Sequence, residues 1–331
     1  MRRRALTLAR VLTVIAVSWL LGGAVAGQAG DHRTPWGDPD LQGTWNASGA
    51  TPMERPAEHA GRATLTDAEV ARLEEQAEAR RDGEPRQGDP GTYNSFWSDR
   101  GRRTTQTSMI VDPKDGRFPP LTPAGEAARK SRARGGDSWE DRHLWERCLT
   151  RGGMPNAMFP RAYNNNAEIV QAPGYVAILL EEIHEARIIP LDGRPHLPQD
   201  VSQWNGDSRG RWEGQTLVVD TRNLDDKVSA LQPWSNFSST SGSGRGLTMV
   251  ERFTRVDANT IAYEITVNDS EMYTRPWTVA FPLVKTTDML YEYACHETNY
   301  GMFGILEGAR AEEARAAATS SPRAGRGGSN R

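Results

Sequence analysis

The chain has 331 residues and a formal net charge of −3, and its body contains no basic run, which argues against nucleic acid as a partner. Hydrophobic residues make up 37% of the sequence, beside 32 glycines, 20 prolines and 10 tryptophans. This composition argues against a helical bundle and favours a loop-rich β protein that packs through aromatic side chains.

Residues 1–26 have the pattern of a secretory signal peptide. The positively charged start MRRRALTLAR is followed by the apolar run VLTVIAVSWLLGGAVA, which ends in Ala24-Val25-Ala26. We therefore expect cleavage near Gly27 and a periplasmic or secreted protein. No later apolar run approaches the length of about 18 residues that a membrane span needs, so we expect no stable membrane insertion after cleavage.

Residues 27–160 are expected to form an N-terminal segment with the first strands and about three helices that pack on the outside of the fold. The stretches PDLQGTWNAS and TSMIVDP read as strands. A capping box of Thr66 and Glu69 begins the first helix, and Thr122 caps the second. A third helix is predicted over residues 138–153, where it would end at two glycines.

Residues 161–309 are expected to form the main antiparallel β region. Strands are predicted in AEIVQA, YVAILLEEIHEARIIPL, RPWTVAFPLV and DMLYEYACHE, and hairpins about residues 213–215 and 257–259. Residues 228–246 form a long polar loop of the kind that serves as a lid or binding loop. Residues 310–331 are rich in Ala, Arg, Gly and Ser, which predicts a disordered tail.

The succession of about seven to nine antiparallel strands joined by short turns predicts a mainly β protein. Its sheet would close as an up-and-down barrel, of the lipocalin or calycin kind, or remain strongly curved. The stretch GTWN near the start is similar to the first-strand G-x-W of lipocalin-type barrels. The helices would then pack outside the barrel or close one end.

The chain has two cysteines, Cys148 and Cys295. Because an exported chain meets oxidising conditions, we predict that they form one structural disulfide. A nucleophilic pair of Cys295 and His296 is disfavoured, because neighbouring residues on a strand point to opposite faces of a sheet.

Several stretches together resemble a large family of exported, mostly uncharacterised bacterial proteins. The resemblance rests on YNNN, IIPLDGRPH, the hairpin WEGQTLVV and the strand YACHE, and it covers roughly residues 36–312. It implies export and a common β fold. The family has no secure activity, so the resemblance assigns no catalytic residue.

The stretch 175–190 holds the first candidates for catalysis. If it runs as one strand, Glu182 and His184 share a face with apolar residues and point into the barrel, where burial tunes a pKa towards neutrality. The alternative is a hairpin that turns at residues 183–185 and exposes both side chains.

The stretch YACHETNY holds His296, the third candidate. If Cys295 faces the helices and bonds Cys148, then His296 faces the interior of the barrel, and Tyr293 on the same strand is a candidate for binding substrate. The alternative for His296 is a core histidine that hydrogen-bonds a carbonyl group. Two histidines and a carboxylate would also suit a metal, although no local metal-binding spacing supports this.

Polar residues elsewhere are candidates for binding a ligand. Arg209 and Arg211 share a face and could clamp a carboxylate or sugar hydroxyls, or they could be solvated charges of an edge hairpin. Asn165 and Asn166 could hydrogen-bond a hydroxyl-rich molecule, or serve a turn. No nucleotide or phosphate motif is present, so no nucleotide cofactor is expected.

The sequence therefore predicts an exported enzyme with acid–base chemistry in a barrel cavity. It would be a lyase, isomerase or hydrolase that acts on a sugar-like or aromatic organic compound. The alternatives are a non-catalytic, lipocalin-like ligand-binding protein and a structural envelope protein. Inward His, Glu and Arg residues in a cluster would favour the enzyme, and an apolar interior would favour the binder.

Overall fold

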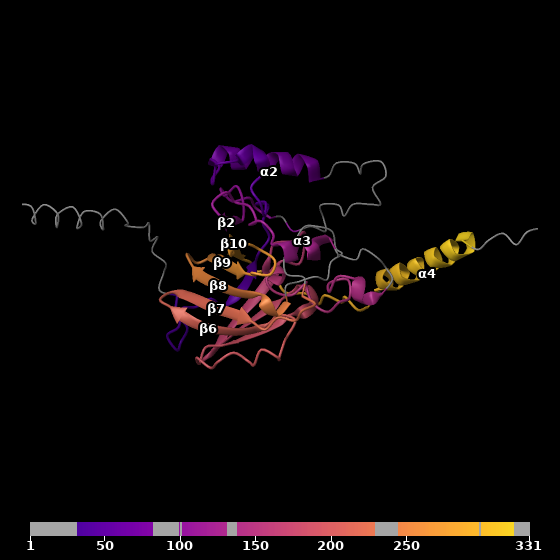
Figure 1. Ribbon diagram of the computed structural model, residues 1–331. Helices are drawn as coiled ribbons and strands as arrows, with labels where there is room; N and C mark the ends of the chain where they lie inside the picture. Colours follow the sequence, from indigo (N-terminus) through magenta and orange to yellow (C-terminus); the bar gives the residue numbers. More distant parts are fainter. Residues whose placement is uncertain are drawn as a thin grey trace, which may run out of the picture.

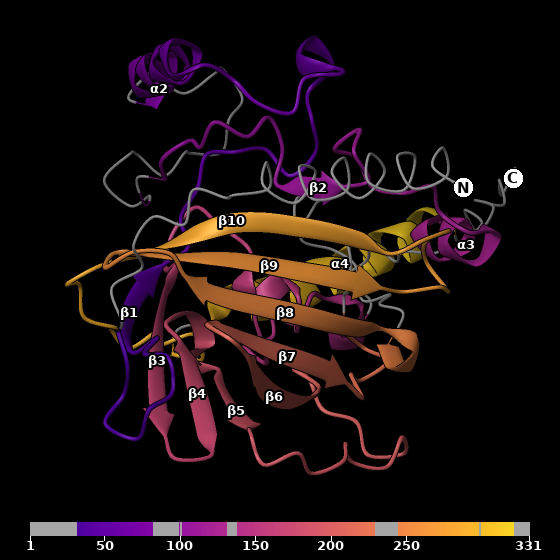
Figure 2. The same ribbon diagram turned by 90° about the vertical axis from the view of Figure 1, so that its left-hand side faces the viewer.

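Nine strands follow one another in chain order around a barrel. The computed structural model describes residues 32–81, 99, 101–130, 138–228, 244–297 and 299–320. Within them, an antiparallel sheet curls into a nearly closed barrel (Figures 1 and 2). Its strands are β1 (Gly43–Asn46), β3 (Asn166–Ala172), β4 (Tyr175–Leu180), β5 (Ala186–Pro190), β6 (Asp207–Glu213), β7 (Thr216–Arg222), β8 (Thr248–Arg255), β9 (Thr260–Asn268) and β10 (Trp277–Lys285).

The ring closes where β10 pairs with β1, with Trp45 opposite Lys285. A tenth strand, β2 (Ile110–Asp112), pairs with β10 near Thr278 and lies off the ring. The predicted up-and-down order and both predicted hairpins are thus confirmed.

The ring is interrupted between β5 and β6. Every pairing from β5 around the barrel to β6 is antiparallel, and the path has eight steps, so β5 and β6 run in the same direction. An odd number of strands cannot alternate in direction all the way around. The two strands lie side by side without a shared ladder of hydrogen bonds (Figure 2), and we call this place the seam. Residues 191–206 carry the chain back to the start of β6.

Alternate residues of each strand fill the barrel interior. On β9, for example, Ile261, Tyr263, Ile265 and Val267 are buried, and the residues between them are not. The Tyr263 ring lies with its centroid 4.8 Å from that of Phe253 and 5.0 Å from that of Phe281. The interior is therefore a packed core.

A charged pair also lies inside this core. Arg187 of β5 donates two hydrogen bonds to the carboxylate of Glu251 on β8, at 3.0 and 2.5 Å. The Tyr263 hydroxyl donates a third to the same carboxylate at 2.9 Å. The two charged side chains are 2% and 0% exposed, so the pair is shielded from solvent and its charges neutralise one another.

Two of the three predicted helices are present. The helix α2 (Asp67–Arg81) begins with the predicted capping box, in which the Glu69 amide donates to the Thr66 hydroxyl and the Thr66 amide to the Glu69 carboxylate. The helix α3 (Pro123–Lys130) is capped by Thr122.

The third predicted helix, over residues 138–153, is wrong. This stretch starts with a short 3₁₀ turn, η3 (Trp139–Asp141), and continues as irregular turns to a second one, η4 (Asn156–Met158). Cys148 has a φ of 55° and Gly152 a φ of 100°, values that a right-handed helix does not allow. The remaining short 3₁₀ turns are η1 (Ala57–His59), η5 (Glu182–His184) and η6 (Gly244–Gly246).

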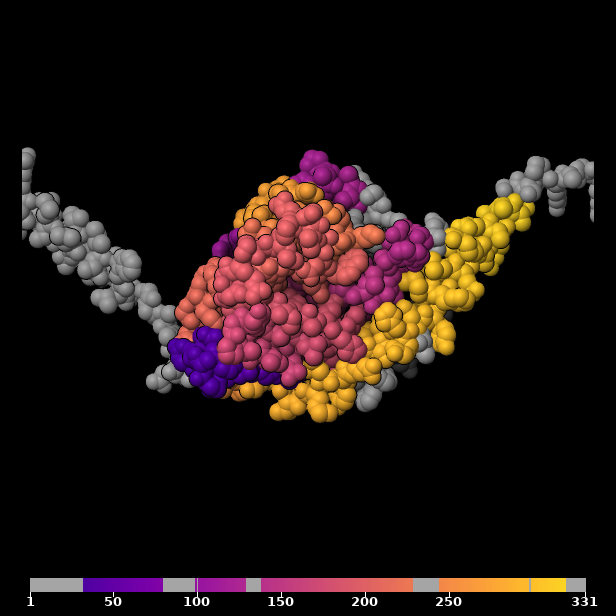
Figure 3. Space-filling model, turned by 90° about the horizontal axis from the view of Figure 1, so that it is seen from below, coloured from indigo at the N-terminus to yellow at the C-terminus, as the bar shows by residue number. Residues whose placement is uncertain are grey.

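The C-terminal part also differs from the prediction. DMLYEYACHE is not a strand: residues 286–297 run as an irregular segment, which we call the strap. After the strap, α4 (Tyr300–Ser320) continues well past residue 310, where disorder was expected, and projects away from the barrel (Figure 3). The predicted signal peptide, residues 321–331 and most of the loop 228–246 lie outside the described residues. None of the described helices has both the length and the apolar character needed to cross a membrane.

Candidate functional site

A sharp turn between β4 and β5 decides which side chains of residues 175–190 face inward. Ile183 and His184 both adopt a left-handed backbone, with φ of 63° and 54°, which non-glycine residues rarely do. The turn breaks the alternation of the strands. Glu182 and Glu185 are therefore buried, whereas His184 is exposed. Glu182 is buried as expected, although it lies in the turn and not on a strand, and the predicted inward position of His184 is wrong. The alternative hairpin is present but does not expose Glu182.

Glu182 and Glu185 lie in a charged group at one end of the barrel, next to Glu181, which is buried as well. Arg151 places its Nε 2.5 Å from a carboxylate oxygen of Glu182, and both side chains are 4% exposed. The backbone amide of Arg151 donates to Glu185 at 2.6 Å. We call this group the end cluster, and its members are Arg151, Arg161, Glu182 and Glu185 with the aromatic residues Trp145, Tyr163 and Tyr293.

Asn165 holds the two arginines of the end cluster in place. Its side-chain oxygen accepts from the Arg161 amide at 2.7 Å and from the Arg151 guanidinium at 3.4 Å, and its amide nitrogen donates to Asp99 at 2.7 Å. Asn166 lies apart and bridges β1 to β3 through a 2.7 Å bond from Asn46. Of the two predicted asparagines, Asn165 contacts the cluster, whereas the side chain of Asn166 bonds Asn46.

Burial raises the pKa of Glu182, and the charges of Arg151 and Arg161 and an interaction with Trp145 offset this only in part. Burial also raises the pKa of Glu185, although hydrogen bonds from Thr150 and from the Arg151 amide lower it. The pKa of Arg161 falls to about 10, because of its burial and the neighbouring charge of Arg151. The cluster thus combines two buried carboxyl groups, whose pKa is raised, with the positive charges of two neighbouring guanidinium groups.

Tyr293 forms the half-buried side of the end cluster. Burial and the nearby charge of Glu182 raise the pKa of its phenol, while interactions with Trp145 and Tyr163 lower it. The Tyr293 amide donates to the exposed His184 ring at 2.9 Å, which fixes the strap over the turn between β4 and β5. Tyr293, which was predicted to bind substrate, thus lies beside Glu182, on the irregular strap and not on the expected strand.

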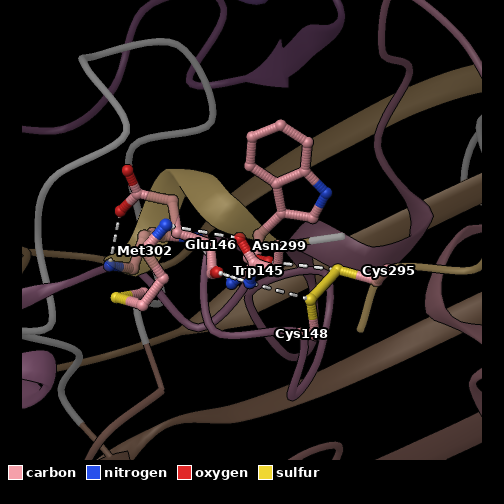
Figure 4. Close-up of a disulfide and its surroundings, with 7 residues drawn as sticks. Trp145, Glu146, Cys148, Cys295, Asn299 and Met302 are labelled. Carbon is pink, nitrogen blue, oxygen red and sulfur yellow. Dashed lines mark hydrogen bonds between the residues drawn. A yellow bond between two sulfur atoms is a disulfide. The ribbon is translucent and has the colours of Figure 1, made fainter. Parts of the chain in front are cut away.

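The predicted disulfide is confirmed and fastens the strap. Cys148 and Cys295 are joined by an S–S bond of 2.07 Å, beside Trp145 (Figure 4). The Asn299 side chain donates to the Glu146 carbonyl at 2.9 Å in the same corner (Figure 4). His296 follows the disulfide on the irregular strap and is exposed, so its predicted place in the barrel interior is wrong.

The two predicted arginines of β6 lie outside the end cluster. Arg209 pairs with Asp207 at 2.5 Å, and Arg211 pairs with Glu213 at 2.6 Å with 58% of its side chain exposed. Arg211 is a solvated charge of the hairpin, as the alternative predicted, whereas the ion pair of Arg209 is largely buried.

The end cluster contains residues that the sequence did not single out. Arg151, Arg161 and Glu185 come from three separate stretches, and a left-handed turn that no sequence pattern announces brings Glu185 inward. A signal for Arg151 was present in its position three residues after the predicted disulfide cysteine and directly before two glycines.

Within the described residues, no group of three or more His, Cys, Asp or Glu side chains could hold a metal ion. No protein-family model, curated protein or solved structure matched the chain in the comparisons. The family resemblance therefore stays a prediction, and function is argued from the residues of this chain.

Proposed function

We propose that this protein is an exported enzyme that carries out acid–base chemistry on a small organic molecule, with Glu182 as the group that transfers the proton. The main observation behind this proposal is that the Glu182 carboxyl group is buried and has a raised pKa. It lies beside the half-buried Tyr293 and the guanidinium groups of Arg151 and Arg161. Carboxyl groups whose pKa is shifted by burial and by specific neighbouring charges occur at many catalytic sites.

The chemistry follows from the groups around Glu182. A carboxyl group whose pKa is raised can donate its proton to a substrate oxygen more readily near neutral pH than an ordinary carboxyl group, and its carboxylate can then remove a proton in a later step. Arg161 would position an anionic or hydroxyl group, the role first expected of Arg209 and Arg211. Such a set of groups suits a lyase, isomerase or hydrolase.

The aromatic residues support a substrate with a flat or sugar-like ring. Trp145, Tyr163 and Tyr293 are half-buried beside the end cluster. Their ring faces offer apolar contact, and their polar groups offer hydrogen bonds. The alternative of a lipocalin-like binder would need space inside the barrel, which the core side chains occupy.

We also propose that the protein works in the periplasm or outside the cell. The signal-peptide pattern predicts export, and the disulfide between Cys148 and Cys295 is compatible with an oxidising compartment.

A substrate screen tests the proposed activity. Purified protein is incubated in D₂O with monosaccharides, uronic acids and phenolic glycosides, and NMR detects new products and deuterium incorporation. We expect at least one compound to be converted, and Glu182→Gln to lower that rate by about 100-fold or more. Glu168→Gln, on the half-exposed face of β3, is the matched control and should retain the rate. Equal turnover by Glu182→Gln, or no turnover of any compound, would contradict the proposal.

A further inference from the structure

The burial of Glu182 means that part of the structure must move before this side chain can touch a substrate. The Glu182 side chain is only 4% exposed, whereas a catalytic carboxyl group must come within hydrogen-bond reach of its substrate. The strap crosses the turn that carries Glu182. Burial and then the charge of Glu182 raise the pKa of the Tyr293 phenol, so this strap residue lies against the carboxyl group. Access to Glu182 therefore depends on how firmly the strap is held.

Few contacts hold the middle of the strap to the barrel. In the described structure, the backbone of residues 287–294 makes two hydrogen bonds to other parts of the chain. The Tyr291 amide donates to the Glu181 carboxylate at 3.5 Å, and the Tyr293 amide donates to Nε2 of His184 at 2.9 Å. The Tyr291 side chain is 65% exposed. A segment with so few buried contacts opens at a small cost in free energy.

The shorter of these two bonds exists in only one protonation state of His184. A backbone amide can donate a hydrogen bond but cannot accept one, so Nε2 of His184 must be the acceptor and carries no proton. The His184 ring is therefore neutral, with its proton on Nδ1. When the ring takes up a second proton, both of its nitrogens become donors. The bond to Tyr293 is then lost, and two N–H groups face one another.

The charged groups around His184 offer no ion pair that would hold the ring in place. Glu182 is paired with Arg151 at 2.5 Å, and Glu185 accepts from the Arg151 amide at 2.6 Å. Among the described residues, no carboxylate forms an ion pair with the exposed His184 ring. The titratable and charged groups of the turn, the strap and the neighbouring corner are Glu181, Glu182, Glu185, Tyr291, Glu292, Tyr293 and Arg151.

We infer that the bond between His184 and Tyr293 is a pH-sensitive latch, which holds the strap over the end cluster near neutral pH and releases it in mild acid. Histidine side chains ordinarily change charge between about pH 5 and 8. The disulfide at Cys295 keeps the end of the strap attached, so the strap closes again when the ring loses its proton. The purpose of the latch rests on the proposed function of Glu182, because release would open the way to that carboxyl group.

Hydrogen exchange at single amides, measured by NMR and corrected for the intrinsic effect of pH, tests the latch. Between about pH 8 and about pH 5, protection of the Tyr293 amide should fall by about tenfold, the factor that corresponds to loss of one hydrogen bond. The Ile265 amide, on the central strand β9, is the internal reference and should stay protected. Equal protection of Tyr293 at both pH values would overturn the inference.

Two histidine variants locate the cause of the release. His184→Gln places an amide oxygen, which does not titrate, where Nε2 lies, so Tyr293 should stay protected at both pH values. His296→Gln is the matched control: it removes the other exposed histidine of the strap and should keep the wild-type pH dependence. The wild-type pH dependence in a folded His184→Gln, or its loss in His296→Gln, would assign the release to another group and overturn the inference.

The wild-type protein alone gives a second test, which does not depend on the folding of a variant. The ¹⁵N shifts of the His184 ring at about pH 8 report which nitrogen carries the proton. We expect Nδ1 to be protonated and Nε2 to be bare. A proton on Nε2 would contradict the latch, because the Tyr293 amide would then have no acceptor.

Carbodiimide coupling to an amine, at one fixed pH near 7, tests whether the latch controls access to Glu182. His184→Ala removes the acceptor at every pH, so Glu182 should couple about tenfold faster than in the wild type. Glu307, exposed on α4, is the reference and should couple equally in both proteins. Equal coupling of Glu182 would overturn the inference. None of these measurements needs a substrate, so a latch that works without turnover in the substrate screen would count against the acid–base proposal alone.

Discussion

Backbone strain at single residues is concentrated beside the end cluster. Five non-glycine residues in the described structure have a left-handed backbone, and Cys148, Asn164, Ile183 and His184 all adjoin this cluster, whereas Asn223 directly follows β7. Asparagine tolerates this conformation, but for the β-branched Ile183 it costs of the order of 1–3 kcal/mol. Packing around Glu182 and Glu185 must hold the strained turn in place. Backbone strain that is held by the surrounding structure is common at functional sites.

His143, beside the end cluster, should make stability depend on pH. Its pKa is lowered to about 4 by burial and then by the charge of Arg161. Between the unfolded pKa of about 6.5 and pH 4, the unfolded chain binds the proton first, so the free energy of unfolding falls as the pH falls. His143→Asn keeps an acceptor for the Trp145 amide and should remove about 3 kcal/mol of this fall in urea titrations.

The exposed His32 provides the control for this measurement. His32→Asn should keep the wild-type pH dependence between pH 6.5 and 4. If His143→Asn followed the wild-type curve as well, the buried neutral histidine would not be the cause.

At the scale of elements, the sequence predicted those strands whose alternation is uninterrupted. Val176 to Leu180 and Ile261 to Val267 alternate between buried and open positions, and both lie where they were expected. The prediction failed where the alternating pattern of apolar and polar residues continued but the backbone did not remain extended. The run through Ile183 has strand-like residues, yet its turn depends on tertiary contacts that no local period reveals. Likewise, the strap around Tyr291 alternates like a strand, yet it pairs with no strand of the described sheet.

The seam gives a prediction at the same scale. Gly210→Ala should lower the free energy of unfolding by about 1–3 kcal/mol, because the added methyl group would overlap Ile189 and Leu191 across the seam. Gly49→Ala is the control: its added methyl group would lie 3.8 Å from the nearest atom, so the substitution should be close to neutral. Urea denaturation measures both. Equal stability of the two variants would show that β5 and β6 are not in tight contact.

At the scale of the whole molecule, a single covalent bond links the strap to the N-terminal half. Cys148 and Cys295 are 147 residues apart in sequence, so their bond restricts a long stretch of the unfolded chain. The count of cysteines and the predicted export were enough to identify this pair. They could not show that the bond also places Tyr293 against Glu182, because that depends on where the strap crosses the barrel.

Replacing both cysteines by serine should lower the free energy of unfolding by about 2–5 kcal/mol. Hydrogen exchange should also become faster at the amides of Tyr291 and Tyr293, which bond Glu181 and His184, while the β9–β10 ladder remains protected. In the wild type, mass analysis of non-reduced peptides should show Cys148 linked to Cys295. Unchanged exchange in the strap of the double variant would mean that the disulfide does not fasten it.

The pairing of β1 with β10 determines the order in which the strands of the barrel can pair while the chain is being synthesised. Trp45 emerges early, but its partner Lys285 is made only after every other strand of the ring. The strands β6 to β10 are consecutive hairpin neighbours and can pair as they emerge, and β3 to β5 can do the same. Until β10 is made, one edge of β1 has no partner strand and is exposed to other chains. Closure of the barrel is thus a late, long-range step, and a chain truncated before β10 would present this edge to its neighbours and aggregate.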